Sequence, residues 1–413
     1  MTTAAEEGTA ASGQGRSIAR RNALLLAAAQ AIVGSASPIT ISMGALAGSY
    51  LLGPDKTLAT LPITGFSLGI AFGAVLAAAV MKRTGRRYGF MGGALLPAIG
   101  GIIAALALFQ QSFALLVAGL TVVGFGNSFV QQYRFAAADA APAAFKPQAI
   151  SLVLAGGVFS AIIGPQVAIY TRQAFEPVMF AGCFVALVPL AFVGIGILSF
   201  LRISEDTAAV ADHAKAEPAR PLAEIVSQPR FIAALACAVG SYALMTFIMT
   251  GAPLAMVGCG FSPDLATLGI QWHAMAMFAP SFFTGRLIAR FGQERIVATG
   301  LFILIGCAVV AHLGIELWNF WLALILLGLG WNFGFIGATA MVTGCYRPSE
   351  KNKVQGFHDV VLFGTVAFAS LASGQVLNAY GWDALNLVIW PVVLICLALL
   401  AVNRLREGTA SAG

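Results

Sequence analysis

Charge is the scarcest property of this sequence. Only 10% of its 413 residues are Asp, Glu, Lys or Arg, whereas 59% are hydrophobic and the mean hydropathy is +0.87. A soluble domain is roughly a quarter charged, and so large an apolar excess cannot be buried in one water-soluble core. The composition therefore excludes a soluble protein and predicts a polytopic membrane protein. The net charge of +6 does not indicate a nucleic-acid partner, because the basic residues are spread over many loops.

Several chemical motifs are also missing. The six cysteines form neither a Cys-x-x-Cys pair nor a Cys/His cluster, so no metal site, disulfide framework or cofactor is expected. No Gly-x-x-x-x-Gly-Lys-Ser/Thr loop occurs, which excludes an ATP-driven pump. A membrane enzyme would need polar residues clustered at one membrane face, but the four histidines are far apart in sequence: His213, His273, His312 and His358. We therefore expect no enzyme and no catalytic residue.

The sequence is instead rich in long apolar runs. A helix that spans a bilayer needs roughly 20 apolar residues. Twelve runs meet this criterion: 23–49, 57–81, 89–109, 113–136, 148–171, 178–201, 231–257, 264–288, 296–314, 318–343, 354–379 and 383–403. The expected fold class is an all-α polytopic membrane protein with 12 transmembrane helices in two six-helix pseudo-symmetric bundles.

The longest polar segment divides these runs into two sets of six. We expect a disordered cytoplasmic N-terminus over 1–21, an N-terminal bundle over 22–201, a cytoplasmic linker over 202–230, a C-terminal bundle over 231–404 and a cytoplasmic tail over 405–413. With this arrangement, 21 of the 23 Lys and Arg residues lie on the cytoplasmic side. Such a bias sets membrane orientation. It predicts a multi-pass protein of the bacterial inner (plasma) membrane with both termini in the cytoplasm.

Two stretches of the first half recur in the second half. "AAAVMKRTGRRYG" (77–89) and "TGRLIARFGQERI" (284–296) share the pattern small-x-x-x-x-Arg-x-Gly. "GFGNSF" (124–129) likewise parallels "GLGWNF" (328–333). Internal repeats of this kind are typical of transporters with a solute site near mid-membrane.

This layout resembles the major facilitator superfamily over about 22–405. The resemblance implies a secondary active or facilitative transporter that moves a small organic solute by alternating access, with a monomer as the sufficient unit. The stretches "GWNFGFIGATAMV", "YRPSEKNKVQ" and "YRFAAADAA" are similar to a proteobacterial branch that includes vitamin importers, riboflavin among them.

The loop motif departs from the family pattern in its charge. The aspartate that closes the cytoplasmic side in the family falls at Lys82 in the first half and at Ala289 in the second. We predict a reversed pair, in which Lys82 or Arg83 reaches Asp359 or Asp139. The alternative is that Lys82 is only an anchor whose charged end reaches the membrane surface.

The fifth apolar run gives a second departure. Gly164-Pro165 is followed by Gln166-Val167, where the family's proton antiporters have Gly-Gly. This disfavours multidrug or metabolite efflux by proton antiport, which is kept as the alternative function. A membrane enzyme or a non-transporting sensor on the same scaffold is the second alternative.

A polar stripe marks the fourth apolar run. Asn127, Gln131 and Arg134 are spaced four and three apart, so they share one face of a helix over 113–136. Lipid rejects such groups, and we expect the stripe to line the solute cavity. Arg134 suits a carboxylate, a phosphate or a ring carbonyl, or it is an interface anchor paired with Asp139. Hydrogen bonding between helices is the alternative role for the two amides.

Hydroxyl, amide and aromatic side chains in other runs complete the substrate-binding candidates: Ser35, Tyr242, Thr246, Trp331 and Asn332. Ser35 precedes Pro38, which is expected to break the helix, although a serine hydroxyl can also bond to its own helix. Trp331 could stack on a planar solute, or it could serve packing alone.

Titratable residues at the ends of the runs are the candidates for coupling or gating: His273, His358, Asp359, Asp139, Lys82 and Arg83. An imidazole titrates near neutrality, so His273 is a candidate for proton transfer, or it is a hydrogen-bonded structural residue. No apolar run has a carboxylate near its centre. We therefore expect a neutral or weakly anionic substrate with a planar or apolar part, and the resemblance implies a compound such as riboflavin. The expected partners are this solute, membrane lipid and, where transport is coupled, protons.

Overall fold

The computed structural model describes residues 2–142, 145–202 and 219–410, and every regular element in these ranges is a helix. Helices satisfy their backbone hydrogen bonds internally, as a lipid environment requires. The chain divides into two compact units. Unit 1 comprises Met1–Met43 and Leu68–Ala209, and unit 2 comprises Gly44–Ser67 and Val210–Gly413. The all-α prediction is confirmed.

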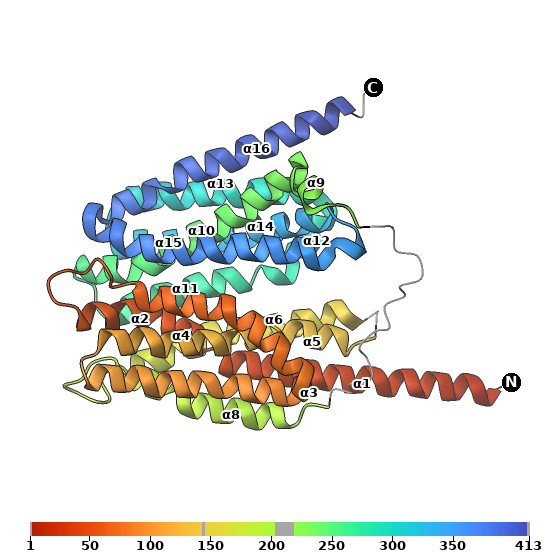
Figure 1. Cartoon of the computed structure of the whole chain (residues 1–413), viewed down its shortest axis with the longest axis horizontal. Helices are drawn as coiled ribbons and strands as arrows, with labels where there is room; N and C mark the ends of the chain where they lie inside the picture. The colour runs from red at the N-terminus through yellow and green to blue at the C-terminus, as the bar shows by residue number, and fades with distance from the viewer. Residues whose placement is uncertain (1, 143–144, 203–218, 411–413) are drawn as a thin grey trace. The chain divides into compact units, whose positions relative to one another are not determined.

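Unit 1 is built from the helices of the first half of the chain (Figure 1). They are α1 (Thr2–Val33), α2 (Ala36–Leu51), α3 (Leu61–Phe109), α4 (Phe113–Val130), α5 (Tyr133–Asp139), α6 (Lys146–Thr171), α7 (Ala181–Val185) and α8 (Leu187–Ser199). The boundary with unit 2 falls inside α2 and α3. Helix α1 packs against α6 and α8. Apolar side chains from six of these helices, including Leu26, Phe90, Tyr133 and Leu198, form one buried cluster.

The first apolar run is interrupted between α1 and α2. The break covers Gly34 and Ser35, so Pro38 lies in the first turn of α2, as its lack of an N–H predicts. Helix α6 crosses at this point. A Cβ atom on Gly164 would lie 2.5 Å from the Pro38 Cγ and 2.7 Å from the Ser35 carbonyl oxygen. Only glycine permits so close an approach.

Unit 2 is built from the helices of the second half. They are α9 (Leu222–Val226), α10 (Pro229–Gly258), α11 (Pro263–Phe278), α12 (Ser281–Phe291), α13 (Gln293–His312), α14 (Leu317–Thr343), the 3₁₀-helix η4 (Pro348–Glu350), α15 (Lys351–Leu387) and α16 (Ile389–Ala410). Helix α14 packs against α10, α11 and α13. A Cβ atom on Gly300 would lie 2.4 Å from the Gly334 nitrogen, so α13 and α14 also depend on small residues for their approach.

The repeated loop motif has the same backbone geometry in both units. Its glycines are Gly85, with φ 75° and ψ 164°, and Gly292, with φ 88° and ψ 156°. This region of φ and ψ is essentially restricted to glycine. The agreement shows that the sequence repeat between 77–89 and 284–296 is a structural repeat.

Replacing Gly292 by alanine is expected to destabilise the protein by about 1–3 kcal/mol through backbone strain alone. No atom lies within 4 Å of a Cβ built at Gly292, so a steric clash does not contribute. The apparent melting temperature of the detergent-solubilised protein measures the loss. Gly285→Ala is the matched control, because Gly285 is helical and also has open space at its Cβ. Equal melting temperatures for the two variants would contradict the strain argument.

Nine helical stretches in the described part of the chain are long and apolar enough to span a membrane. Two of them, Leu61–Phe109 and Lys353–Arg406, contain 49 and 54 residues and cover two predicted runs each. The predicted run 264–288 falls on α11 and α12, which contain only 16 and 11 residues. The multi-pass class is confirmed, and the count of twelve spans stays a prediction.

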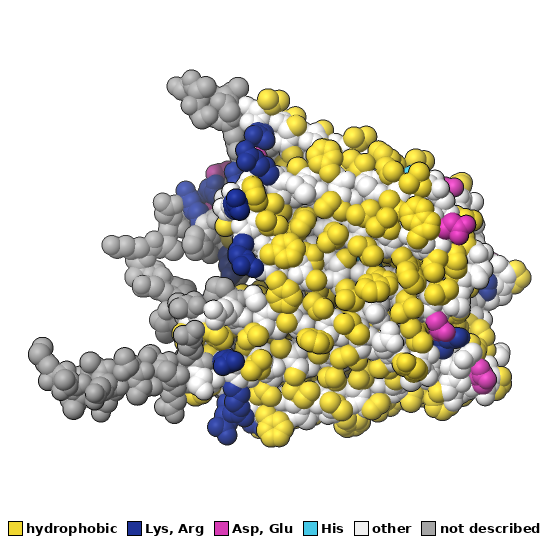
Figure 2. All heavy atoms as spheres, turned by 180° about the vertical axis from the view of Figure 1, so that it is seen from behind, with side chains coloured by type: hydrophobic (Ala, Val, Ile, Leu, Met, Phe, Trp, Pro, Cys, Tyr) yellow, Lys and Arg dark blue, Asp and Glu magenta, His cyan; other side chains and the backbone are white. Residues whose placement is uncertain are grey.

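Large apolar side chains are exposed along the helices, as contact with lipid requires. Figure 2 shows hydrophobic side chains over most of the visible surface, with few charged side chains among them. Phe72, Val75 and Phe192 of unit 1 and Phe302 and Phe368 of unit 2 are all more than half exposed. A water-soluble protein does not expose so many.

The predicted domain boundaries stay predictions. Most of the expected linker 202–230 lies outside the described residues, as does the end of the expected tail 405–413. Helix α1 begins at Thr2, and the side chains before Ser17 lie outside the described part, so the expected disorder of 1–21 is not tested. The unit boundary assigns Gly44–Ser67 to unit 2, although this segment precedes the expected linker.

Candidate functional site

Unit 2 contains a cluster of four aromatic side chains from three helices. Trp331 and Phe335 of α14 are stacked, with ring centroids 5.3 Å apart and an angle of 14° between the rings. Tyr242 of α10 meets both edge-on, at 5.5 and 5.0 Å. Phe363 of α15 lies 6.4 Å from Tyr242. These separations are those at which aromatic pairs attract, so the four rings form a fixed aromatic surface.

This surface has both an apolar and a polar binding element. Phe335 and Phe363 are half-buried, so part of each ring remains accessible. The Trp331 Nε1–H is buried and has no hydrogen-bond partner among the residues that the structure describes. An unsatisfied buried donor costs about 1–3 kcal/mol. A planar solute with a ring acceptor could therefore stack on the cluster and satisfy this donor.

Thr246 lies one turn after Tyr242 on α10, as the sequence predicts. Thr246 is 4% exposed. One turn further, the buried Thr250 hydroxyl has no hydrogen-bond partner within the described residues. The hydroxyl groups of Thr246 and Thr250 therefore lie on the same face of α10 as Tyr242.

Asn332 is fully buried and bonds to the break between α11 and α12. Its Nδ2 donates to the Met277 carbonyl and to the Ser281 Oγ, each at 2.7 Å. Its Oδ1 accepts from the Thr284 hydroxyl at 2.6 Å. This side chain joins α14 to both ends of the break at Pro280. Its predicted contact with substrate is untested, and the geometry gives it a positioning role.

Asn332→Ala is expected to lower the apparent melting temperature strongly. The substitution removes three hydrogen bonds and leaves buried polar groups unsatisfied, at about 1–3 kcal/mol for each group. Thr284→Val removes only one of these bonds and should give a smaller decrease. Thermal unfolding of the purified protein in detergent measures both. An Asn332→Ala variant that melts with the wild type would contradict this role.

In unit 1 the polar stripe crosses a slight irregularity in the helix. The expected helix over 113–136 is divided into α4 and α5, but Gln131 keeps a right-handed helical conformation and its N–H still bonds to the Asn127 carbonyl at 3.1 Å. The Asn127 and Gln131 side chains are half-buried and make no hydrogen bond within the described residues. Their amides are available to a solute. Arg134 is exposed, with its guanidinium 4.8 Å from the Phe135 ring centroid.

The Ser35 hydroxyl is engaged within its own helix. It donates to the Ala31 carbonyl at 2.6 Å, and the residue is fully buried. This is the alternative that the sequence left open. The contact of Ser35 with substrate is untested.

The gating candidates of unit 1 contain one ion pair. Arg86 Nη2 lies 2.5 Å from Asp139 Oδ2, which joins α3 to α5. Asp139 was expected to bind Lys82 or Arg83, but Arg86 binds it instead; Arg86 follows the kink at Gly85, whereas the other two precede it. Lys82 and Arg83 are exposed. Their predicted pairing with Asp359 stays a prediction.

His273 is fully buried in α11. Its Nδ1 lies 2.8 Å from the Leu324 carbonyl oxygen, a geometry in which Nδ1 donates. The opposite nitrogen, Nε2, is buried without a partner in the described part of the chain. This arrangement corresponds to the neutral imidazole of a structural histidine, one of the two roles that the sequence left open.

His358 and Asp359 form a neighbouring pair near the start of α15. The His358 Nδ1 lies 3.0 Å from the Asp359 Oδ1, and the two side chains are 7% and 59% exposed. The pair thus joins a buried imidazole to an accessible carboxylate.

The sequence interpretation missed Phe335, Phe363, Arg220 and Glu350. Phe335 follows Trp331 by four residues, so the helical spacing could have identified it. Phe363 belongs to another helix and had no comparable signal. Arg220 and Glu350 are 130 residues apart in sequence and form an ion pair in which the carboxylate is buried and the guanidinium is partly exposed.

A multi-pass helical fold whose helices present aromatic and amide side chains to a solute is typical of membrane transporters. The chain belongs to the Major Facilitator Superfamily, whose family model matches residues 22–331 and 260–412. The transporter prediction and the resemblance drawn from the loop motifs are therefore confirmed. A membrane enzyme or a sensor is not favoured, and a transporter implies a small-molecule substrate.

Named relatives agree with this assignment. The riboflavin transporter RfnT of Brucella anthropi is 48% identical over 396 residues, which cover 95% of this chain and 98% of that protein. Two solved structures share the fold. The POT family transporter PepTSo has a TM-score of 0.70 at 12% identity, over 95% of this chain and 98% of that one. A D-xylose–proton symporter has a TM-score of 0.65 at 12% identity, over 93% and 96%.

Proposed function

We propose that this protein transports riboflavin into the bacterial cell by alternating access. The observation that supports this most directly is its 48% identity to a riboflavin transporter over nearly the full length of both chains. Riboflavin has a planar, uncharged ring system and a polyhydroxyl chain. A neutral solute agrees with the lack of carboxylates near the centres of the apolar runs.

In unit 2, the proposed contacts are the aromatic cluster and the Trp331 Nε1–H. The flavin ring would stack on the accessible part of Phe335 and Phe363, and a ring nitrogen or carbonyl would accept from Trp331. Stacking of a planar heterocycle on an aromatic side chain contributes about 1–3 kcal/mol. In unit 1, the proposed contacts are the amides of Asn127 and Gln131, which can bond to carbonyl, imide or hydroxyl groups.

The proposed location is the bacterial inner membrane, with both termini in the cytoplasm and a monomer as the working unit. The distribution of basic residues supports this orientation, because 21 of 23 lie on the side of the termini. Arg86–Asp139 and His358–Asp359 are the proposed gating pairs. Arg86 follows the kink in α3, Asp139 ends α5 and His358–Asp359 lies near the start of α15, and each pair includes a carboxylate with more than half of its surface exposed.

Uptake of labelled riboflavin tests the proposal in cells that lack their own flavin carriers. We expect riboflavin to accumulate with this protein and not with an empty vector. A protonophore added to the same cells measures dependence on the proton gradient. Trp318→Ala is the matched control for a substitution of Trp331. It also removes an indole from α14, but Trp318 is 54% exposed and lies outside the aromatic cluster. Riboflavin uptake equal to the empty vector would refute the proposal, provided that the protein reaches the membrane.

A further inference from the structure

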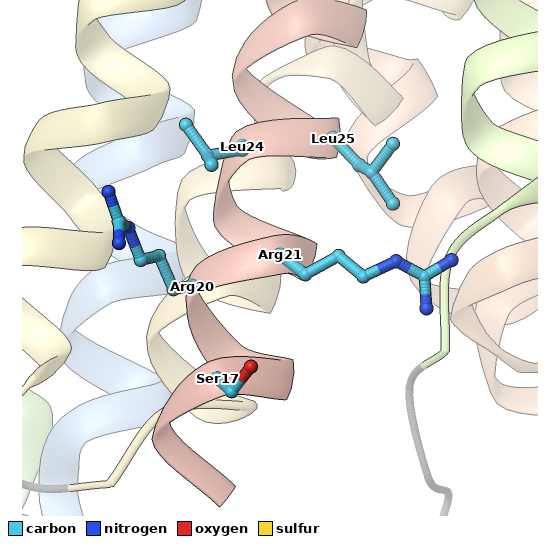
Figure 3. Close-up of a pocket in the computed structure, with 5 residues that line it drawn as sticks. All are labelled: Ser17, Arg20, Arg21, Leu24 and Leu25. Atoms are coloured by element: carbon cyan, nitrogen blue, oxygen red, sulfur yellow. The ribbon is translucent and has the colours of Figure 1, made fainter. Parts of the chain in front are cut away.

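One face of α1 forms an open groove that transport does not explain. Ser17, Arg20, Arg21, Leu24 and Leu25 line it, with a volume of about 370 Å³. Their spacing of three, one, three and one places them on one side of the helix. In Figure 3 the two arginine side chains extend to opposite sides of α1, and each leucine lies one turn beyond an arginine.

The groove faces away from the protein interior. Ala19, Ala23 and Leu26 of the same helix are buried in the core of unit 1. Ser17, Arg20, Arg21 and Leu24 are instead exposed, and 48% of the Leu24 surface is accessible. The helix therefore presents two guanidinium groups and a large apolar side chain to its surroundings.

Neither arginine has an acidic partner among the described residues. The one hydrogen bond from this pair is Arg21 Nη2 to the Phe200 carbonyl oxygen at 3.2 Å. The corresponding arginine at the start of α10, Arg230, donates to the Gln293 Oε1 within the protein. The charges of Arg20 and Arg21 thus remain available for an external anion.

A buried asparagine in this part of α1 binds the backbone of a third arginine, Arg202. The Asn22 Nδ2 donates to the Arg202 carbonyl at 2.8 Å, and its Oδ1 accepts from the Arg202 N–H at 3.2 Å. Asn22 is 1% exposed, and its two hydrogen bonds to the Arg202 backbone fix the chain after α8 to α1. The exposed Arg202 is therefore fixed close to the groove.

We propose that this groove binds one anionic phospholipid, whose headgroup lies over α1 within reach of the flanking Arg20 and Arg21 and whose acyl chain lies along Leu24 and Leu25. The order of polarity supports a lipid rather than a free anion. The arginines directly precede the apolar run 23–49, and Leu24 and Leu25 lie one turn further along α1, inside that run. A phospholipid at the membrane surface has the same order, from charged head to apolar chain.

Native mass spectrometry of the full-length protein with phosphatidylglycerol tests this site. We expect Arg20→Gln/Arg21→Gln to weaken binding of one phosphatidylglycerol about 30-fold, from about 1 kcal/mol for each basic residue near an anionic lipid surface. Wild-type protein should bind phosphatidylcholine much more weakly than phosphatidylglycerol. Arg87→Gln/Arg404→Gln is the control, because it removes two exposed charges outside the groove and should leave binding unchanged.

Two further arms separate a lipid site from a phosphate site. Leu24→Ser should weaken phosphatidylglycerol binding, and millimolar glycerol 3-phosphate should not displace the lipid. Equal binding by wild type and the Arg20/Arg21 variant would overturn the proposal. So would equal loss in the control variant, equal affinity for phosphatidylcholine, or full displacement by glycerol 3-phosphate. The comparison of the two lipids needs only wild-type protein, so it decides the matter even where a variant does not fold.

Discussion

Trp331→Ala is expected to abolish riboflavin uptake, whereas Trp331→Phe should retain uptake with a raised KM. Alanine removes the ring that stacks on Phe335 at 5.3 Å and supports Tyr242. Phenylalanine keeps an aromatic ring but removes the Nε1–H donor. Without the Trp331 ring, Phe335 loses the side chain that holds its ring in place. A lost stacking contact between the flavin and Phe335 weakens binding by about 1–3 kcal/mol, which is about 5- to 150-fold in affinity. Initial rates of labelled riboflavin uptake at several concentrations measure both effects.

The experiment must distinguish a loss of solute binding from a loss of packing in the folded protein. Trp331 is 8% exposed, so its truncation also leaves a cavity in unit 2. Phe335→Leu provides the second variant, because leucine preserves an apolar side chain and removes the half-buried stacking ring. It should raise KM while the amount of folded protein stays at the wild-type level. Wild-type kinetics in both Trp331→Ala and Phe335→Leu would show that the aromatic cluster does not bind the solute.

The apolar runs predicted the helices well because length and hydropathy are local properties. The ends of the runs differ from the ends of the helices where a single residue determines the backbone geometry. The run 264–288 became α11 and α12, since Pro280 interrupts the helix and Asn332 bonds to the exposed groups. Conversely, α3 and α15 continue through Gly85 and Gly381, whose positive φ produces a kink without a long loop.

Only part of the candidate site could be predicted from the sequence. Trp331 and Tyr242 were identified as candidates, but their mutual contact depends on the packing of α10 against α14. Likewise, the packing of α14 against α11 and α12 determines that the Asn332 side chain forms hydrogen bonds to residues of these two helices. Its residue type alone suggests solute binding. Spacing along one helix is visible in a sequence, whereas partners on other helices are not.

Glu350 shows the largest gap between sequence and structure. It is fully buried in η4, and its carboxylate accepts from the Arg220 Nε and Nη2, both at 2.9 Å. The backbone N–H groups of Arg220 and Arg347 also donate to it, at 2.8 and 2.9 Å. These bonds fix the chain before α9 to the segment before α15. Hydrogen bonding from the Arg220 side chain, with smaller contributions from backbone donors, holds the pKa of Glu350 well below its usual range.

Glu350→Gln is therefore expected to lower the apparent melting temperature at neutral pH. The neutral amide cannot replace the ionic bonds, and it leaves the Arg220 guanidinium without its counter-charge. A carboxyl group with a lowered pKa in the folded state stabilises the fold fully above its unfolded pKa of about 4.3. This contribution is lost as the pH falls through the folded value. The difference in melting temperature between wild type and variant should thus be constant from pH 7 to about 5 and shrink in stronger acid.

Glu224→Gln is the matched control for this experiment, because Glu224 is exposed in the nearby α9 and its loss should leave the melting temperature unchanged. Arg220→Gln should resemble Glu350→Gln, since either substitution breaks the same pair. A pH-independent difference would mean that shape alone, rather than charge, stabilises this junction. Wild-type melting in both variants would show that the ion pair contributes nothing to stability.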